Sequence, residues 1–288
     1  MIQNQKIVFI GSGVMAEAMI AGLIRQKVAA PDALIAAGPR VERGDELHTQ
    51  YGITTLVDNA VAAQQGDVVV LSVKPQRLDK VLSGLCGFIQ PHALVLSIVA
   101  GATIGKISSQ LKHHLIVRSM PNTPAQIGEG ITVWTAAQEV SDEQREMARQ
   151  ILGAFGEEVY VDDENYLDMA TAISGTGPAY VFLFMEAMVD AGVHLGFPRR
   201  IAEQLVAYTL RGSVDYYLKR SSSVHLAHLR NQVTSPGGTS AAALYYLEKA
   251  GFRTAISRAI WAAYERSQEL GKGGQSHPPE KNADNWTR

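Results

Sequence analysis

Three glycine-containing segments of this 288-residue chain carry residue types that could hold an anionic ligand. The first, Gly11–Ala16, follows the apolar run Ile7–Ile10 and matches the pattern G-x-G-x-x-G/A. In that pattern Gly11 allows a tight turn, Gly13 lets a pyrophosphate approach the backbone, and the small Ala16 lets a helix pack on the strand. The N–H groups at the start of that helix would bind the phosphates. The segment therefore predicts a dinucleotide site, although such glycines can also mark an ordinary turn.

The other two glycine segments lie in the second half of the chain. Ser174–Pro178 reads Ser-Gly-Thr-Gly-Pro and would interrupt a long helix, whereas Ser235–Ser240 reads Ser-Pro-Gly-Gly-Thr-Ser and would open one. The N–H groups of Gly238, Thr239 and Ser240 would point out of that helix end toward an anion. Because no charged side chain lies in the segment, it suits a small carboxylate. The alternative for both segments is a helix-breaking connector, which is the ordinary use of glycine.

The second expected strand indicates which dinucleotide would bind. In NAD-binding domains an acidic residue usually ends this strand and binds the ribose 2′-hydroxyl. Here the strand Ala33–Ala37 is followed by Gly38-Pro39-Arg40, and the first acid, Glu42, is flanked by Arg40 and Arg43. A missing carboxylate beside guanidinium groups favours a 2′-phosphate, so NADPH is predicted, with NADH as the weaker alternative. Both arginines could instead be ordinary solvated charges.

Three more segments follow predicted strands and are expected at the same ligand edge, because open α/β sheets bind ligands at the carboxyl ends of their strands. They are Val73–Pro75, Val99–Gly101 and Met120–Pro124, and the alternative is three ordinary loops. The residues that we expect to contact the cofactor are Gly11, Ser12, Gly13, Val14, Met15, Ala37, Gly38, Arg40, Asn59, Val73, Lys74, Pro75, Ala100, Gly101, Asn122 and Thr123.

Strand-like and helix-like segments alternate in the first half, which is typical of βαβ units and a parallel sheet. The strand-like runs are Ile7–Ile10, Ala33–Ala37, Val68–Val73, Leu94–Val99, His114–Arg118, Ile131–Thr135 and Val159–Val161. The helix-like segments between them are Met15–Gln26, Arg43–Tyr51, Arg77–Leu85, Thr103–Leu111 and Ser141–Phe155. After about Glu164 only helical spacing remains, over Tyr166–Ile173, Pro178–Leu195, Pro198–Lys219, Val224–Val233, Thr239–Ala250 and Arg253–Leu270.

These patterns predict an α/β protein with a Rossmann-type parallel sheet domain over residues 1–163 and an all-helical domain over residues 164–271. The segment 272–288 lacks periodicity and is expected to be disordered. The helix Pro178–Leu195 is apolar around most of its circumference, which indicates burial on several sides. In so small a domain this suggests cover by a partner chain.

Composition narrows the function classes. The hydrophobic share is 46%, the charged share is 19% and the net charge is −2, so we expect an ordinary globular protein and no nucleic-acid partner. Cys86 is the only cysteine, which fits a reducing cytoplasm. We expect no secretory signal and no metal site. We also expect no membrane span, because Glu186 and Asp190 interrupt the longest apolar run well short of the ~18 residues required.

Five segments together resemble the pyrroline-5-carboxylate reductase family in order and spacing: Gly11–Ala16, Val73–Pro75, Met120–Pro124, Ser174–Tyr180 and Ser235–Thr239. The resemblance covers residues 6 to 270, and its most specific part is Ser-Pro-Gly-Gly-Thr. It implies reduction of 1-pyrroline-5-carboxylate to L-proline, the last step of proline biosynthesis, with NADPH. It also implies an intertwined homodimer, or a ring of such dimers, in which the Rossmann domain of one chain faces Ser235–Ser240 of the other.

The resemblance also turns the two later glycine segments into a substrate site. The residues that it assigns to substrate binding are Ser174, Gly175, Ser235, Gly237, Gly238, Thr239 and Ser240. Ser240 stands where the family usually has a second threonine after the two glycines, and it keeps the hydroxyl. Hydride attack on a C=N carbon is easier when the nitrogen is protonated, and the hydroxyl of Ser240 is the best proton donor in the segment. Positioning would supply much of the acceleration, ~7–11 kcal/mol.

Two other functions remain open at this point. One is a related imine or β-hydroxyacid reductase of similar plan. A hydroxyacid reductase would need a lysine general acid on the first long helix after the sheet, and Pro178–Leu195 contains no lysine. A non-catalytic NADP sensor would need no tight anion loop for a substrate, whereas Pro236–Gly238 resembles one.

Overall fold

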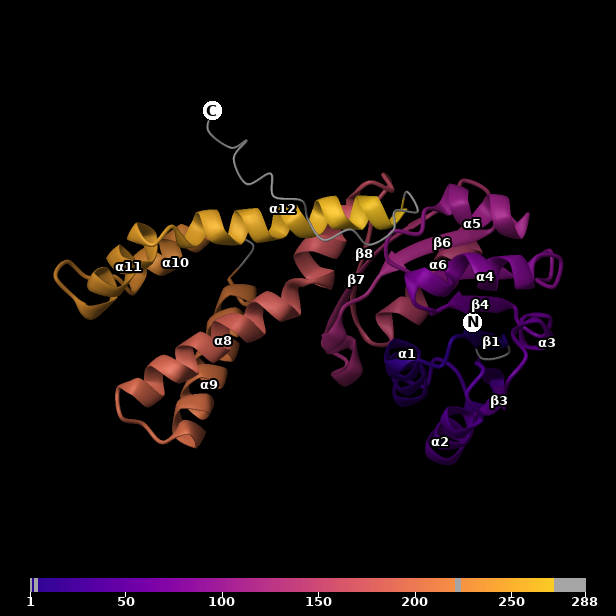
Figure 1. Ribbon diagram of the computed structural model, residues 1–288, viewed down its shortest axis with the longest axis horizontal. Helices are drawn as coiled ribbons and strands as arrows, with labels where there is room; N and C mark the ends of the chain where they lie inside the picture. Colours follow the sequence, from indigo (N-terminus) through magenta and orange to yellow (C-terminus); the bar gives the residue numbers. More distant parts are fainter. Residues whose placement is uncertain (1, 3–4, 221–223, 272–288) are drawn as a thin grey trace. The chain divides into compact units, whose positions relative to one another are not determined.

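The computed structural model describes residue 2 and residues 5–220 and 224–271, which form two compact units (Figure 1). The first unit holds the chain up to Thr176 and again from Ala263, and the second holds Gly177–Ala262. The units therefore divide the chain after residue 176, and the boundary expected after residue 163 stays a prediction. The expected tail, residues 272–288, lies outside the described residues.

The first unit is built on one sheet of eight strands in the order β3-β2-β1-β4-β5-β6-β7-β8. The strands are β1 (Ile7–Ile10), β2 (Leu34–Ala37), β3 (Thr54–Leu56), β4 (Val68–Leu71), β5 (Leu94–Ser97), β6 (Ile116–Met120), β7 (Gly130–Ala136) and β8 (Gly156–Tyr160). Strands β1 to β6 are parallel, as predicted, but β7 runs antiparallel to β6. The link between β6 and β7 is a short 3-10 turn, η3 (Thr123–Ile127), and a parallel crossover would need a longer connection.

Helices cover both faces of this sheet (Figure 1). The helices of this unit are α1 (Val14–Arg25), α2 (Val41–Tyr51), α3 (Asn59–Ala63), α4 (Pro75–Leu85), α5 (Ile104–Leu111), α6 (Asp142–Gly153) and α7 (Tyr166–Ala170). Successive residues of β1 point to opposite faces, so Ile7 and Phe9 pack with α1, α2 and α6, whereas Val8 and Ile10 pack with α3, α4 and α5. Burial on both faces explains why the strands read as continuous apolar runs.

Local signals set where these helices begin and end. The hydroxyl of Ser141 accepts from the backbone N–H of Gln144, whose side chain accepts from the N–H of Ser141, and this capping box confirms the predicted start of α6. The carboxylate of Asp58 caps α3 by accepting from the backbone N–H groups of Ala60 and Val61. The helix α2 ends at Gly52, whose φ of 70° suits glycine. Neither β3 nor α3 was predicted from the sequence, because both are short.

The second unit is helical. Its elements are α8 (Gly177–His194), α9 (Arg199–Leu218), α10 (Leu226–Gln232), α11 (Thr239–Lys249) and the first part of α12 (Phe252–Gly271). Helices α8 and α9 lie side by side (Figure 1), and their core consists of Val189, Ala202 and Val206. Large apolar side chains remain exposed, including Leu183 at 67% and Leu195 at 83%. An exposed apolar surface of this kind marks an interaction site, as the apolar pattern of α8 predicted.

The chain does not break at Ser174–Pro178, where we expected an interruption. After α7 it forms a single π turn, η4 (Thr171–Gly175), and then continues into α8. The helical stretch Tyr166–His194 thereby reaches 29 residues and contains an 18-residue window with a mean hydropathy of 1.3, enough by length and composition to cross a membrane. Our expectation that no apolar run approached this length was wrong. This is weak evidence for a span, because helices packed inside soluble proteins meet the same criterion.

Candidate active site

The tight turn after β1 lies where the strand order reverses, between β1 and β4. Gly11 has φ of 105°, and a Cβ on it would lie 2.7 Å from the carbonyl oxygen of Ser72. The hydroxyl of Ser72 donates to the carbonyl of Gly11 at 2.7 Å. Gly13 is the N-cap of α1, and among the described residues no heavy atom lies within 4 Å of where its Cβ would be. The turn is therefore closed at Gly11 and open at Gly13, as a pyrophosphate site requires.

The end of β2 forms a small pocket beside this turn. A Cβ on Gly38 would lie 2.8 Å from the hydroxyl of Ser12, so glycine is required for that approach. Ser12, Gly38, Arg40, Val41 and Val57 help to line a pocket of about 140 Å³. Arg40 is exposed at the N-cap of α2. Asp45 also lines this pocket, but the three residues that follow β2 carry no carboxylate. The exposed guanidinium of Arg40 at this position suits a ribose 2′-phosphate.

Asn59, the first residue of α3, provides a second indication that a ligand binds at this edge. Its Oδ1 atom is buried and has no hydrogen-bond partner in the described part of the chain. An unsatisfied buried acceptor is costly and needs a donor. A ribose hydroxyl could supply that donor, so the residues present fit a dinucleotide at this edge.

The remaining expected cofactor residues follow β4, β5 and β6. Lys74 is the exposed N-cap of α4, between Val73 and Pro75. The Oδ1 of Asn122 accepts from the backbone N–H of Ile131 at 3.0 Å, which leaves its amide group as a donor. The sheet brings these residues to one edge with the turn at Gly11, because the carboxyl ends of parallel strands share an edge. The other expected residues there are Val14 and Met15 at the start of α1, Ala37 at the end of β2, Ala100 after β5 and Thr123 at the start of η3.

Gly101 has a packing role that the sequence did not indicate. Its φ is 71°, and a Cβ there would lie 2.8 Å from the backbone nitrogen of Gly271 and 3.0 Å from the carbonyl oxygen of Ser267. The last turns of α12 thus pack directly on this glycine. Ala100, which precedes it, remains the partly exposed residue of the pair.

The π turn brings one of the two expected substrate segments to the same edge. A Cβ on Gly175 would lie 2.6 Å from the Cε atom of Met120, the last residue of β6. The hydroxyl of Ser174 donates to the carbonyl of Ala170 at 2.9 Å. Single π turns inside helices occur frequently at functional sites. Ser174 and Gly175 therefore lie beside the expected cofactor residues at the end of β6.

The second substrate segment forms the start of α11 in the helical unit. Gly238 is the N-cap, and its N–H donates to the carbonyl of Ser235 at 3.0 Å. Gly237 has φ of 71°, which favours glycine. Thr239 and Ser240 are the first two helical residues, and N–H groups at such positions have no partner within the helix. The segment can bind an anion through its backbone and offers the half-buried Ser240 hydroxyl beside it.

A buried ion-pair network around Arg118 was not predicted. Arg118 is 3% exposed in β6 and donates to Glu164 and Asp168, each at 2.9 Å. Asp168 also accepts from the hydroxyl of Ser267 at 2.8 Å, and Glu164 accepts from the N–H of Ile104 at 2.8 Å. The network joins β6, α7, the start of α5 and the end of α12. The sequence signal that could have revealed this network is the presence of a charged residue, Arg118, inside an apolar strand.

Comparisons with known proteins agree with this architecture. Residues 164–270 match the family model for pyrroline-5-carboxylate reductase dimerisation, and residues 6–101 match that for NADP oxidoreductase, coenzyme F420-dependent. A pyrroline-5-carboxylate reductase of Synechocystis is 45% identical over 91% of this chain and 97% of its own length. That of Pseudomonas aeruginosa is 41% identical over 93% of this chain and 98% of its own. The chain belongs to the pyrroline-5-carboxylate reductase family.

A solved structure of the family has the same fold. The Plasmodium falciparum pyrroline carboxylate reductase, whose crystal structure has NADP bound, superposes with a TM-score of 0.85 at 32% identity, covering 93% of this chain and 99% of that one. Because the dimerisation model matches residues 164–270, the helical part of this reductase is a self-association domain. Self-association can bury the apolar surface of α8 against a second copy of the chain, so this surface does not require a membrane.

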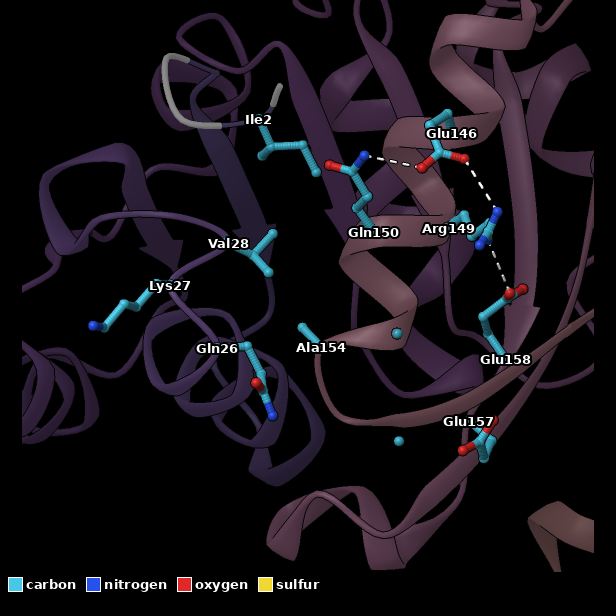
Figure 2. A pocket seen from close by; sticks show the side chains of 12 residues that line it. Ile2, Gln26, Lys27, Val28, Glu146, Arg149, Gln150, Ala154, Glu157 and Glu158 are labelled. Atoms are coloured by element: carbon cyan, nitrogen blue, oxygen red, sulfur yellow. Dashed lines mark hydrogen bonds and ion pairs between the residues drawn. The ribbon is translucent and has the colours of Figure 1, made fainter.

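A pocket of about 580 Å³ lies away from the residues expected in the reductase site. It is bounded by the ends of α1 and α6 and by β8 (Figure 2). Glu146 accepts from Gln150 and from Arg149, and Arg149 also donates to Glu158. These charges pair with one another across the pocket wall, so we assign the pocket no part in the reaction.

Two of the described histidines have structural partners. His113 is buried, its Nε2 donates to the carbonyl of Ala93 at 2.7 Å, and burial lowers its pKa. The ring of His225 caps α10 by accepting from the N–H of Ala227. Among the described residues, His, Cys, Asp and Glu form no group that could hold a metal ion.

Proposed function

We propose that the chain reduces 1-pyrroline-5-carboxylate to L-proline with NADPH. The observation that carries this proposal is the combination of family membership with a dinucleotide edge in which an arginine, and no acid, lies within the three residues after β2. In the reaction the imine carbon gains a hydride and the imine nitrogen gains a proton. The reduced nicotinamide, when bound, supplies the hydride and is oxidised.

The residues of the first unit would bind the cofactor. Gly13 and the N–H groups at the start of α1 hold the pyrophosphate, Arg40 contacts the 2′-phosphate, and Asn59 accepts from a ribose hydroxyl. The open space at Gly13 and the unpartnered Oδ1 of Asn59 support these roles. The NADP bound to the Plasmodium relative supports the choice of cofactor.

The two glycine segments would bind the substrate. The N–H groups at the start of α11 hold the carboxylate, with Gly237 and Gly238 keeping the backbone free of side chains there. Ser240 then donates a proton to the imine nitrogen, or relays one from water. Ser174 and Gly175 form the wall of the substrate site beside β6.

The active protein would be a homodimer or a ring of dimers in the cytoplasm. The small core of the helical unit and its exposed apolar side chains support burial against a second copy. The family resemblance implies that the Ser235–Ser240 segment of one chain serves the cofactor domain of its partner.

A substrate panel tests the proposal. Purified protein should consume NADPH, followed by the loss of its absorbance, when 1-pyrroline-5-carboxylate is added, and proline should accumulate in equal amount. Hydroxy acids with NADP and keto acids with NADPH serve as controls for a β-hydroxyacid reductase. Turnover of those controls without turnover of the cyclic imine would contradict the proposal, and nucleotide binding without any turnover would favour an NADP sensor.

A further inference from the structure

The side chain of Arg43, in α2, is fully engaged near the glycine turn. Its Nε donates to the carbonyl of Ser12 at 3.1 Å, its Nη1 donates to Glu46 at 2.9 Å, and its Nη2 pairs with Glu17. The side chain is only 18% exposed. Glu17 is held from its other oxygen by the hydroxyl of Tyr51 at 3.0 Å. Each of the three guanidinium nitrogens of Arg43 therefore has a partner.

Moving Arg43 toward a phosphate would break this arrangement. Glu17, 24% exposed, would keep its negative charge without a cationic partner, and separating a partly buried pair is costly. Hydrogen bonds to Glu17 and Glu46 raise the pKa of Arg43, and burial raises the pKa of Tyr51. The raised pKa of Arg43 is the direction expected of an arginine that pairs with carboxylates.

The contact with Ser12 gives Arg43 a different role. Ser12 lies between Gly11 and Gly13, and the peptide bond from Ser12 to Gly13 is planar and trans. The N–H of Gly13 therefore points opposite to the carbonyl of Ser12. By fixing that carbonyl, Arg43 fixes the direction in which the N–H of Gly13 is presented.

Arg40 differs from Arg43 in each respect. It is exposed, it makes no capping hydrogen bond, and among the described residues it forms no ion pair. It lines the small pocket with Ser12 and Gly38. Its guanidinium group is available to a phosphate without the loss of another contact.

We infer that Arg43 is a positioning residue that holds the Ser12–Gly13 peptide for the pyrophosphate, and that selectivity for NADPH over NADH is set by Arg40 alone. The inference rests on the proposed function and deepens it. It differs from the expectation that both arginines act on the 2′-phosphate. Arg43 then contributes equally to both cofactors, because both carry the same pyrophosphate.

Nucleotide titrations of the full-length protein test this division. Dissociation constants for NADPH and NADH are measured by nucleotide fluorescence for the matched variants Arg40→Ala and Arg43→Ala. Arg40→Ala should weaken NADPH by about tenfold or more, the usual value of a hydrogen bond to a charged group, and NADH by less than about twofold. Arg43→Ala should weaken both by the same factor, so the ratio of the two constants stays at its original value.

Arg43→Lys separates positioning from charge. Lysine keeps the positive charge and can pair with Glu17, but it lacks the fork that reaches Ser12 at the same time. Both cofactors should bind as weakly as they bind to Arg43→Ala, while the melting temperature returns toward its original value. A purely structural role would restore binding together with the melting temperature. Arg43→Lys also decides the question if Arg43→Ala does not fold.

A selective loss of NADPH binding in either Arg43 variant, matching that of Arg40→Ala, would overturn the inference. Failure of the unaltered protein to bind either nucleotide would instead contradict the proposed function. Because binding is measured without substrate, the two failures are distinguishable.

Discussion

Ser240→Ala is expected to lower kcat/KM for 1-pyrroline-5-carboxylate by roughly ten- to a hundred-fold while leaving NADPH affinity unchanged. The hydroxyl is the only part removed, and a hydrogen bond to a charged group is worth ~1.5–3 kcal/mol. Ser240 is the second residue of α11, and its backbone N–H remains to bind the carboxylate. The loss should therefore fall mainly on kcat, because proton donation is needed after the substrate is bound.

Ser240→Thr is the matched control. It keeps the hydroxyl, adds one methyl group at a half-buried position and restores the residue usual in the family, so activity should change little. Steady-state rates over a range of substrate concentrations measure both variants. Full activity in Ser240→Ala would show that backbone N–H groups alone bind the substrate and that solvent provides the proton.

Arg118→Met should destabilise the first unit by about 3 kcal/mol, near the lower end of the cost of leaving buried charges unpaired. Methionine fills much of the same space, but Asp168, 15% exposed, and Glu164, 32% exposed, lose their cationic partner. The partial exposure of Glu164 to water places the estimate at the low end. Urea unfolding at a fixed protein concentration measures the change, because self-association also contributes to stability.

Arg149→Met provides the control for this experiment. Arg149 pairs with Glu146 and Glu158 on the surface and is 60% exposed. Exposed pairs contribute about 0–1 kcal/mol, so this variant should unfold near the urea midpoint of the unaltered protein. Equal effects of the two substitutions would mean that the Arg118 network does not hold α7 and the end of α12 to the sheet.

Elements that carry a strong local signal were predictable from the sequence. The continuous apolar runs of β1 and β4 and the Ser141 cap of α6 appear where we expected them. The antiparallel direction of β7 was not predictable from strand propensity, because it depends on the length of the connection between β6 and β7. The π turn at Thr171–Gly175 was read as a break, because glycine and proline mark breaks far more often than they mark π turns.

The residue types of the candidate site were predictable from the sequence, but the separate roles of individual residues were not. The glycines after β1 and β2 lie where their pattern placed them. The packing of Gly101 against Ser267 and Gly271 depends on residues more than half the chain away, which no local motif reports. The same holds for Arg43, since its pairing with Glu17 joins two helices.

The transfer of deuterium to proline tests the central claim most directly. The protein is incubated with 1-pyrroline-5-carboxylate and with NADPH that carries deuterium at the transferable position of its nicotinamide, and the product is analysed by mass spectrometry. The account predicts proline with one deuterium on the ring carbon that was the imine carbon, in an amount equal to the NADPH consumed. Consumption of NADPH without labelled proline would contradict it.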